Sequence, residues 1–350
     1  MLFAQLTRSI GLNDVCDSLR LNSSSLSSVR AATPPSRNGL SHANKVRPAE
    51  MAEKLFWSVL EHLEKTFPQY GKGKLPGPLR RFRRSIQIID STTIELVANC
   101  MDWAKHRRRK AAAKTHMRLD MESLLPRFAI VDTAKHNDNR KARELCAGLK
   151  DGEIVIFDRA YNDWEHLSDL SKRGIWWVGR EKKGTVYDLL SCREISGEIV
   201  ADEEIMLTNN THARRVTAWG VVDGKRRQMT FLTNHLDWSA ATICELYKAR
   251  WQIEIFFKQI KQTLKLGDFL GHSANAVRWQ VWIALLVYVL LRFISRMTQW
   301  SHSFTRLFAI VRASLWKRIN MLDYLQKLCG TAGGHFRHLA RPEQAYFAGF

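Results

Sequence analysis

The stretch Tyr247-Lys-Ala-Arg250-Trp-Gln-Ile-Glu254, followed after six intervening residues by Lys261, decides the fold of this chain. No Pro or Gly interrupts it, and its composition predicts one continuous helix from Tyr247 to Lys261. At about 100° per residue, the four numbered side chains project from one narrow face of that helix. A neighbouring apolar stripe would anchor the helix on a core. The predicted helix therefore holds one carboxylate among cations.

Two interpretations of this charged helix are open. It is either an amphipathic surface helix, in which Glu254 pairs with Arg250 and Lys258 at spacings of four, or a metal-binding glutamate flanked by cations that hold phosphates. The surface pairs would be worth a few tenths of a kcal/mol. Lys265 also lies beside the charged face. Charge-laced helices are common, so the choice depends on the rest of the chain.

The charge balance of the whole chain points to a polyanionic partner. Among 350 residues, 54 are Lys or Arg and 34 are Asp or Glu, which gives a formal net charge of +20. A surplus of this size favours binding to a polyanion through counterion release, and nucleic acid is the first candidate.

Cysteines and apolar runs exclude several other classes. The six cysteines are scattered and form no Cys-x-x-Cys pair, which argues against a zinc site or a disulfide framework and favours a reducing cytoplasm. The longest apolar run, 281–291, is shorter than the roughly 20 residues that a bilayer span requires. We therefore expect a buried helix there and no membrane partner.

The order of predicted elements indicates an α/β fold. Strands are predicted at 86–90, 115–119, 128–131, 153–158 and 174–179, and helices at 139–149 and 163–173. Three strands followed by helix, strand, helix, strand and a later carboxylate-bearing helix is the order of ribonuclease-H-like folds with a mixed sheet. Between the last of these strands and the Glu254 helix, strand-like runs at 198–207, 214–222 and 228–233 predict an all-β insertion.

Composition suggests four regions. We expect helical regions at 1–84 and 271–350 on either side of a ribonuclease-H-like domain made of 85–180 and 238–270. Residues 181–237 form the β-rich insertion within that domain. Residues 23–48 indicate a linker or short helices with turns, and 49–67 a helix. The first helix has no capping residue, so an incomplete N-terminus or a misplaced start codon is an open alternative.

Two aspartates accompany Glu254 in this order. Asp90 and Asp158 each end a predicted strand, where open α/β sheets place their active sites. Taken singly, each would be an ordinary turn residue. Three carboxylates without Cys suit Mg²⁺, or Mn²⁺ as a substitute, and two ions about 3.5 to 4 Å apart can drive phosphoryl displacement. We predict Asp90, Asp158 and Glu254 as catalytic metal ligands.

The spacing Tyr-x2-Arg-x3-Glu-x6-Lys resembles the YREK signature of the insertion-sequence-four family of bacterial DDE transposases. The patterns Asp90-Ser-Thr, Asp158-Arg-Ala-Tyr161 and Lys114-Thr-His116, and the all-β insertion, also resemble that family. The similarity covers roughly 81–266 strongly and 36–44 more loosely.

This resemblance implies an activity and a partner. It implies metal-dependent cleavage of transposon ends, a hairpin intermediate and strand transfer into target DNA. Asp90, Asp158 and Glu254 would be the metal ligands. Tyr247, Arg250 and Lys261 would contact phosphates near the transposon end. The partner would be double-stranded DNA held by a homodimer in the bacterial cytoplasm, in association with the nucleoid.

Further DNA contacts are expected at aromatic and basic positions. In the resembled family an insertion tryptophan stacks on a flipped base, and Trp219 is our first candidate, with Trp176 and Trp177 as competitors. For any one of the three, core packing is the commoner role. The basic loop 105–110, including Arg107 and Arg108, would either track the DNA backbone or be simply solvated. Lys258 and Lys265 would add to the basic face of the signature helix.

Two residue roles are more specific. We expect His116, on a strand adjoining Asp90, to be a core or supporting histidine and not a metal ligand, because the three carboxylates already suffice. We expect Arg250 and Lys261 to clamp phosphate around the metal rather than to pair with Glu254.

Two rival functions stay open at this stage. One is a nuclease of the same fold that cleaves without strand transfer, and the other is a catalytically idle DNA-binding relic that regulates a full-length transposase. The presence of all three carboxylates argues against the relic. Strand transfer cannot be read from residues alone.

Overall fold

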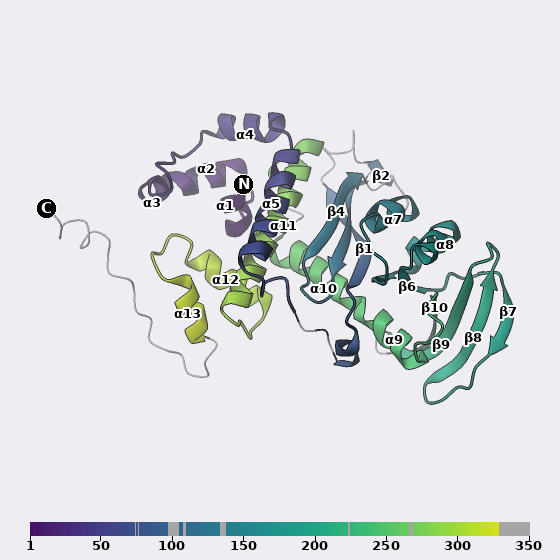
Figure 1. Ribbon diagram of the computed structural model, residues 1–350. Helices are drawn as coiled ribbons and strands as arrows, with labels where there is room; N and C mark the ends of the chain where they lie inside the picture. The colour runs from purple at the N-terminus through teal and green to yellow at the C-terminus, as the bar shows by residue number, and fades with distance from the viewer. Residues whose placement is uncertain are drawn as a thin grey trace.

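The computed structural model of the chain describes residues 1–73, 75, 77–96, 105–107, 110–133, 138–222, 225–265 and 269–328. A mixed sheet with flanking helices occupies the centre of the molecule (Figure 1). The N-terminal helices and the last two helices lie at one end of it, and the strands of the insertion lie at the opposite end.

The central sheet has the ribonuclease-H-like arrangement that the sequence predicts. Its strands are β1 (Ile86–Leu96), β2 (Lys105–Arg107), β3 (Lys110–Asp120), β4 (Pro126–Thr133), β5 (Ile154–Phe157) and β6 (Trp176–Arg180). β1 pairs antiparallel with β3, and β3 pairs antiparallel with β4 and β2. β1 pairs parallel with β5, and β5 parallel with β6. The parallel strands are joined through the helices α7 (Asp138–Cys146) and α8 (Trp164–Lys172).

The insertion continues this same sheet. Its strands are β7 (Tyr187–Cys192), β8 (Ile199–Leu207), β9 (His212–Val222) and β10 (Lys225–Thr233). Each pairs antiparallel with the next, and β10 pairs antiparallel with β6, so the strand order runs β6-β10-β9-β8-β7. The three strand-like runs predicted here are confirmed as β8, β9 and β10. β7 was not predicted, because this edge strand is largely exposed on both faces and lacks an apolar alternation.

Helices from the two ends of the chain pack together. The N-terminal part forms α1 (Leu2–Thr7), α2 (Leu12–Leu21), α3 (Ser23–Ser27), α4 (Arg37–Val46), α5 (Glu50–Thr66) and the short 3₁₀ helix η1 (Gly77–Arg81). The C-terminal part forms α11 (Ala274–Met297), α12 (Phe304–Ala313) and α13 (Met321–Leu328). The helix predicted at 49–67 is confirmed, and the stretch 23–48 contains two short helices. The predicted break at 330–341 lies outside the described residues.

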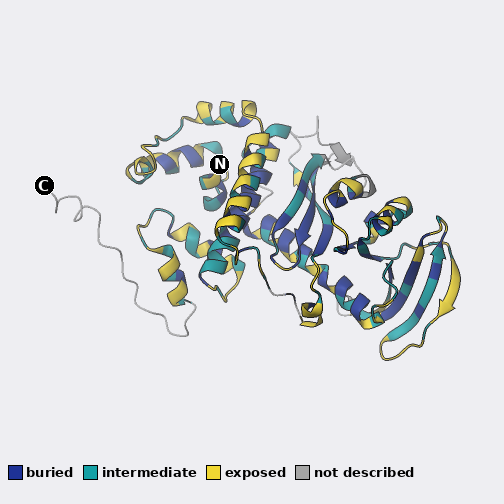
Figure 2. Ribbon diagram, viewed as in Figure 1, coloured by how far each residue is buried: buried dark blue, intermediate teal, exposed yellow. Residues whose placement is uncertain are grey.

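α11 is the core helix of the molecule. It contains the apolar run 281–291 and packs against α5. By length and composition alone α11 could cross a bilayer, but 67% of its most apolar 18-residue window is buried inside the protein. The prediction of a buried helix is confirmed, and Figure 2 shows the buried residues concentrated in α11 and the central strands.

The signature helix is not continuous, so that prediction is wrong. α9 (Ala240–Ala249) and α10 (Trp251–Lys258) meet at Arg250, and the π-helix η4 (Gln259–Thr263) follows. The backbone N–H of Arg250 donates to the carbonyl of Tyr247 at 3.0 Å, and that of Ile253 donates to the carbonyl of Arg250 at 3.1 Å, so the turn is tightened there. No Pro or Gly causes the break. Single π-turns of this kind are frequent at functional sites.

Packing at both ends fixes these helices. Ser239 caps α9 by accepting from the backbone N–H of Thr242 at 3.2 Å, as its position predicts. The guanidinium of Arg8, just after α1, donates to the carbonyl of Thr263 at 2.6 Å. The N-terminal helix thereby holds the end of the π-turn in place.

Candidate active site

The two aspartates lie on neighbouring parallel strands. Ile89 of β1 pairs with Phe157 of β5, and the aspartates are the next residue on each strand. Asp158 comes directly after β5, as predicted. Asp90 does not end its strand, because β1 continues to Leu96 while paired with β3. It stands instead where the pairing with β5 stops, which places both carboxylates at the same step of the sheet.

The signature residues connect all three carboxylates. The hydroxyl of Tyr247 donates to Oδ1 of Asp158 at 3.2 Å. The guanidinium of Arg250 binds the other two carboxylates. It donates from Nη1 to Oδ2 of Asp90 at 2.9 Å and from Nη2 to Oε1 of Glu254 at 2.6 Å. The structure therefore links Asp90 and Glu254 through Arg250, and holds Asp158 through Tyr247.

Lys261 reaches β1 beyond the aspartate. Its Nζ donates to the carbonyl of Thr93 at 2.8 Å and to Oγ1 of Thr92 at 3.2 Å. Neither threonine was predicted as a site residue, although the Asp90-Ser-Thr pattern was the available signal. The amine of Lys261 is exposed and lies over the same strand as Asp90.

The expectation that Arg250 would not pair with Glu254 is wrong for this structure. Arg250 pairs with both Glu254 and Asp90, because its guanidinium is the nearest cation to two partly buried carboxylates. Lys258 is exposed and, among the described residues, forms no ion pair with Glu254. Lys265 is also exposed.

Burial and crowding of carboxylates set the electrostatics of the site. Burial, helped by the charges of Asp158 and Glu254, raises the pKa of Asp90 to about 6 against the opposing effects of Arg250 and the backbone N–H of Ser91. Burial alone would lower the pKa of Arg250, but Tyr247, Asp90 and Glu254 raise it above its ordinary value. With all three carboxylates ionised, the site carries excess negative charge around one guanidinium.

The donor set fits a hard divalent cation in its chemistry. Asp90, Asp158 and Glu254 offer carboxylate oxygens without a Cys, the set that Mg²⁺ and Mn²⁺ prefer. Their excess negative charge also favours a cation. In the part of the chain that the structure describes, no three acidic, His or Cys side chains lie close enough together to hold a metal ion. Arg250 links two of the three carboxylates instead.

His116 is a buried neighbour of the site, as predicted. It lies on β3 opposite Ser91 of β1 and is fully buried. Its Nδ1 is 3.4 Å from the hydroxyl of Tyr161, which comes from the Asp158-Arg-Ala-Tyr161 pattern. The ring therefore supports the aspartate-bearing strands from within the core.

The three candidate tryptophans differ in exposure. Trp177 is fully buried and its indole N–H donates to Oγ of Ser171 at 3.0 Å, so it offers no face to a base and that candidate is wrong. Trp176 packs against His235, with ring centroids 4.5 Å apart. Trp219 of β9 is 39% exposed, and the guanidinium of Arg226 lies 5.0 Å from its ring centroid. The stacking role of Trp219 stays a prediction.

The basic loop is only partly described. Arg107 belongs to β2, whose side chains lie outside the described part, and Arg108 is also outside it. Their contact with DNA stays a prediction.

A family comparison covers this whole arrangement. The family model described as the transposase DDE domain matches residues 81–290, which include both aspartates, the insertion and the signature residues. The chain belongs to the DDE transposase family. Transposases of this family use divalent metal ions.

Individual relatives agree with this assignment. The chain is 28% identical over 323 residues to a putative transposase, y4zB, of Sinorhizobium fredii, which covers 90% of this chain and 86% of the relative. It is 28% identical over 227 residues to a probable transposase for the insertion sequence element IS5377 of Geobacillus stearothermophilus, covering 63% of this chain and 59% of the relative. It is also 25% identical over 191 residues to the transposase InsG for the insertion sequence element IS4 of Escherichia coli, covering 50% and 42%. The resemblance to the insertion-sequence-four family is confirmed.

Among solved structures, the piggyBac transposase synaptic complex with hairpin DNA is similar at a TM-score of 0.49 and 9% identity. The match covers 99% of this chain and 73% of that one.

Proposed function

We propose that this DDE transposase cleaves double-stranded DNA at the inverted-repeat ends of an insertion sequence and transfers the freed 3′ ends into target DNA. The second strand would be cut through a hairpin intermediate. One observation carries the proposal: Tyr247 and Arg250 connect the three carboxylates Asp90, Asp158 and Glu254, which come from three distant parts of the chain.

Each side chain has a role in this proposal. Asp90, Asp158 and Glu254 would hold the metal, with Mg²⁺ as the natural ion and two ions as the expected number. Metal held by these three carboxylates would supply activation of the attacking oxygen and stabilisation of the leaving oxygen. Arg250 holds Asp90 and Glu254 before DNA binds and contacts a phosphate afterwards. Lys261, fixed on β1, places a second cation beside that phosphate.

The same proposal assigns regions and an assembly. Residues 1–84 would bind DNA, 85–180 with 238–270 would carry the chemistry, and 181–237 would contact the transposon end. Because two DNA ends must be held together, we propose a homodimer on DNA, acting in the bacterial cytoplasm.

A product assay tests this function. The full chain is incubated with linear DNA that ends in the inverted repeats of its own locus, with Mg²⁺, with Mn²⁺ or with EDTA. We expect hairpin ends and joined products with Mg²⁺ or Mn²⁺ and none with EDTA. Cleavage without hairpins or joining would instead indicate a nuclease, and binding without cleavage a regulatory relic.

A second prediction concerns Tyr247. Burial raises its pKa to about 12, so the hydroxyl keeps its proton and donates to Asp158. Its ring packs against Phe231, with centroids 4.7 Å apart. Tyr247→Phe keeps this packing and removes the hydrogen bond, so we expect metal affinity or cleavage rate to fall by about 10- to 100-fold.

The measurement is the cleavage rate as a function of Mg²⁺ concentration, with thermal unfolding as a check on the fold. Tyr187→Phe is the matched control, because Tyr187 lies in the insertion beside Arg215. If the Tyr247 variant has the parent's rate and metal dependence, this hydroxyl does not position Asp158.

A further inference from the structure

A second cationic site lies outside the carboxylate cluster. A groove with a volume of about 780 Å³ is formed by the chain that follows α5, the turn after β3 and the C-terminal half of α11. Its charged lining residues are Lys72, Glu122, Arg292 and Arg296. We call this feature the arginine groove. Three cations there face a single carboxylate.

The two arginines lie one turn apart on α11 and are incompletely satisfied. The Nε atoms of Arg292 and Arg296 are buried without a hydrogen-bond partner. Arg292 makes one long hydrogen bond, from Nη2 to the carbonyl of Ser123 at 3.3 Å. Across the described ranges neither arginine forms an ion pair with a carboxylate. Burial lowers the pKa of Arg296, and the charge of Arg292 lowers it further.

A structural role explains only part of the placement of Arg292 and Arg296. Cations in the last turns of a helix interact favourably with its dipole, by about 0.3 to 1 kcal/mol. That accounts for positive charge at the end of α11. It does not explain why two guanidinium groups sit together with buried, unpaired nitrogens, since such groups are costly unless an anion pairs with them.

The rest of the lining is rich in hydrogen-bond donors. Gln69, Gln252 and Ser295 also line the groove. Glu122, the one acid, accepts from the backbone N–H of Gly73 at 3.1 Å. Guanidinium forks surrounded by amide and hydroxyl donors match the oxygen atoms of a phosphodiester.

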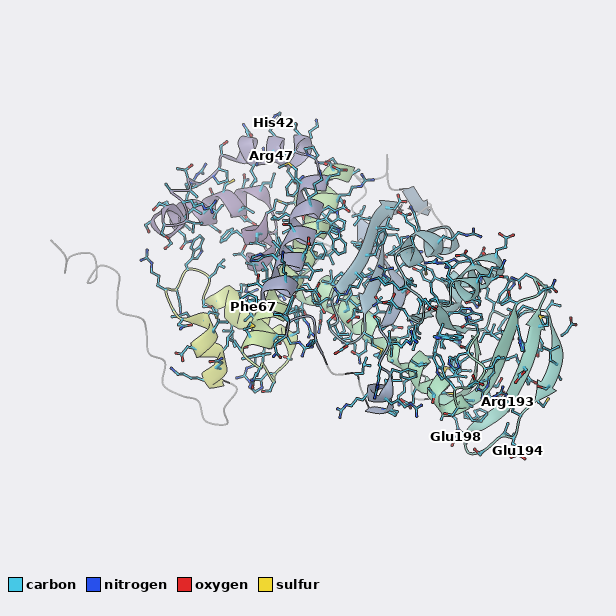
Figure 3. The ribbon with its side chains drawn as sticks, in the orientation of Figure 1. His42, Arg47, Phe67, Arg193, Glu194 and Glu198 are labelled. Carbon is cyan, nitrogen blue, oxygen red and sulfur yellow. The ribbon has the colours of Figure 1, made fainter. Side chains whose placement is uncertain are left out.

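The walls of the groove are fixed. The ring of Phe67, labelled at the end of α5 in Figure 3, lies 5.0 Å from that of Phe293 on α11. A Cβ atom on Gly73 would lie 1.6 Å from the carbonyl oxygen of Glu122 and 2.8 Å from Nη2 of Arg296, so only glycine allows this approach. The arginine groove is therefore a built feature and not a gap between loose loops.

The arginine groove lies behind the catalytic carboxylates. Gln252 reaches it from α10, the helix that carries Glu254. Two positions along a helix correspond to a rotation of about 200°, so the side chains of Gln252 and Glu254 project from opposite faces of α10. A phosphate in the groove is therefore not the reacting phosphate.

We propose that the arginine groove binds the sugar-phosphate backbone of DNA at a point that flanks the reacting phosphate, with Arg292 and Arg296 as phosphate ligands. The proposal rests on the proposed function in that the partner is DNA. Its effect is on DNA affinity and its dependence on salt, and not on the chemical step.

The test measures the affinity of the full chain for linear double-stranded DNA as a function of salt concentration. The logarithm of the binding constant falls linearly with the logarithm of the salt concentration, and each lost phosphate contact reduces the magnitude of that slope by about 0.9. We expect the double variant Arg292→Gln, Arg296→Gln to lose about 2 from the slope and about 10- to 100-fold in affinity near 0.1 M salt. Its single-turnover cleavage rate at saturating DNA should stay near the parent's.

The matched control removes two cations that are already paired and lie outside the proposed DNA-binding region. Arg143 pairs with Glu165 at 3.2 Å and Lys327 with Asp323 at 2.7 Å, so Arg143→Gln, Lys327→Gln should keep the parent's slope. If the groove variant folds as the parent does, by thermal unfolding, and keeps the slope, the proposal is wrong. If that variant unfolds, Lys72→Gln decides, because Lys72 is exposed: its slope should fall by about 0.9, and an unchanged slope overturns the proposal.

Failure of the proposed function would look different. A parent protein that binds DNA but neither cleaves nor joins it would overturn the proposed function. The slope measurement would still support or overturn the arginine groove.

Discussion

Replacement of Glu254 by Gln is expected to lower the rate of DNA cleavage by a factor of about 10³ or more, with little change in DNA affinity or fold. Gln keeps the size of the side chain and removes its charge. A metal that stabilises charge in the transition state contributes several kcal/mol, and each 1.36 kcal/mol corresponds to about tenfold in rate. Arg250 keeps its contact with Asp90 in this variant, so the helix stays anchored.

Glu245→Gln is the matched control for this experiment. Glu245 is on the neighbouring helix α9, and its side chain is 38% exposed against 35% for Glu254. It pairs with Lys248 at 3.6 Å instead of with Arg250. We expect the control to cleave within about twofold of the parent, because it lies outside the carboxylate cluster. A Glu254→Gln protein that cleaves as fast as the control would show that this helix does not carry the catalytic glutamate.

The spacing of the signature predicted which side chains meet, although it predicted the wrong helix. Tyr247 contacts Asp158, Arg250 contacts Asp90 and Lys261 contacts Thr93, while Glu254 pairs with Arg250. The backbone is overwound at Arg250, where bonds span three residues, and underwound in the π-turn that contains Lys261. These two departures rotate the face in opposite senses, so the shared face survives.

Other features depend on contacts that no local pattern contains. The pairing of Arg250 with Asp90 joins residues 160 positions apart, and composition alone cannot choose between a carboxylate and a phosphate as its partner. The pairing of β10 with β6, which merges the insertion with the central sheet, is likewise a long-range register. Trp176 and Trp177 are adjacent in a strand, so their side chains point to opposite faces of the sheet. The sequence alone does not determine which of the two faces the fully buried side.

The end of β1 illustrates the same limit. The β-branched run predicted a strand that ends at Asp90, whereas the strand continues through Ser91, Thr92 and Thr93 because β3 pairs with it. These polar residues are common in turns, so tertiary pairing overrode the local signal. The consequence is functional, since the extended strand provides the atoms that hold Lys261.

The largest effect on stability is expected at a buried ion pair in the insertion. Arg214 binds both carboxylate oxygens of Asp202, at 2.7 and 2.6 Å, and the two side chains are 4% and 5% exposed. Arg214 also donates to the carbonyl of Leu236 at 2.6 Å and to that of Trp238. This single guanidinium ties β8 and β9 to the segment that leads into α9.

Arg214→Ala is therefore expected to lower the free energy of unfolding by about 3 to 5 kcal/mol, because it leaves the Asp202 carboxylate buried without a partner. The measurement is urea denaturation of the full chain. Arg226→Ala is the matched control. Arg226 pairs with Glu198 at 2.6 Å, but both side chains are more than half exposed. Figure 3 labels Glu198, which lies in the insertion, far from the helical end of the molecule.

Loss of that exposed ion pair should lower the free energy of unfolding by less than about 1 kcal/mol. The double variant Arg214→Met, Asp202→Leu should recover much of the loss, because it removes both charges from the interior together. A loss below about 1 kcal/mol for Arg214→Ala, or a double variant no more stable than the single one, would mean that the buried charge of Asp202 does not set the stability of the insertion. Because α9 leads directly to Tyr247 and Arg250, we also expect Arg214→Ala to lower cleavage at temperatures where the insertion begins to unfold.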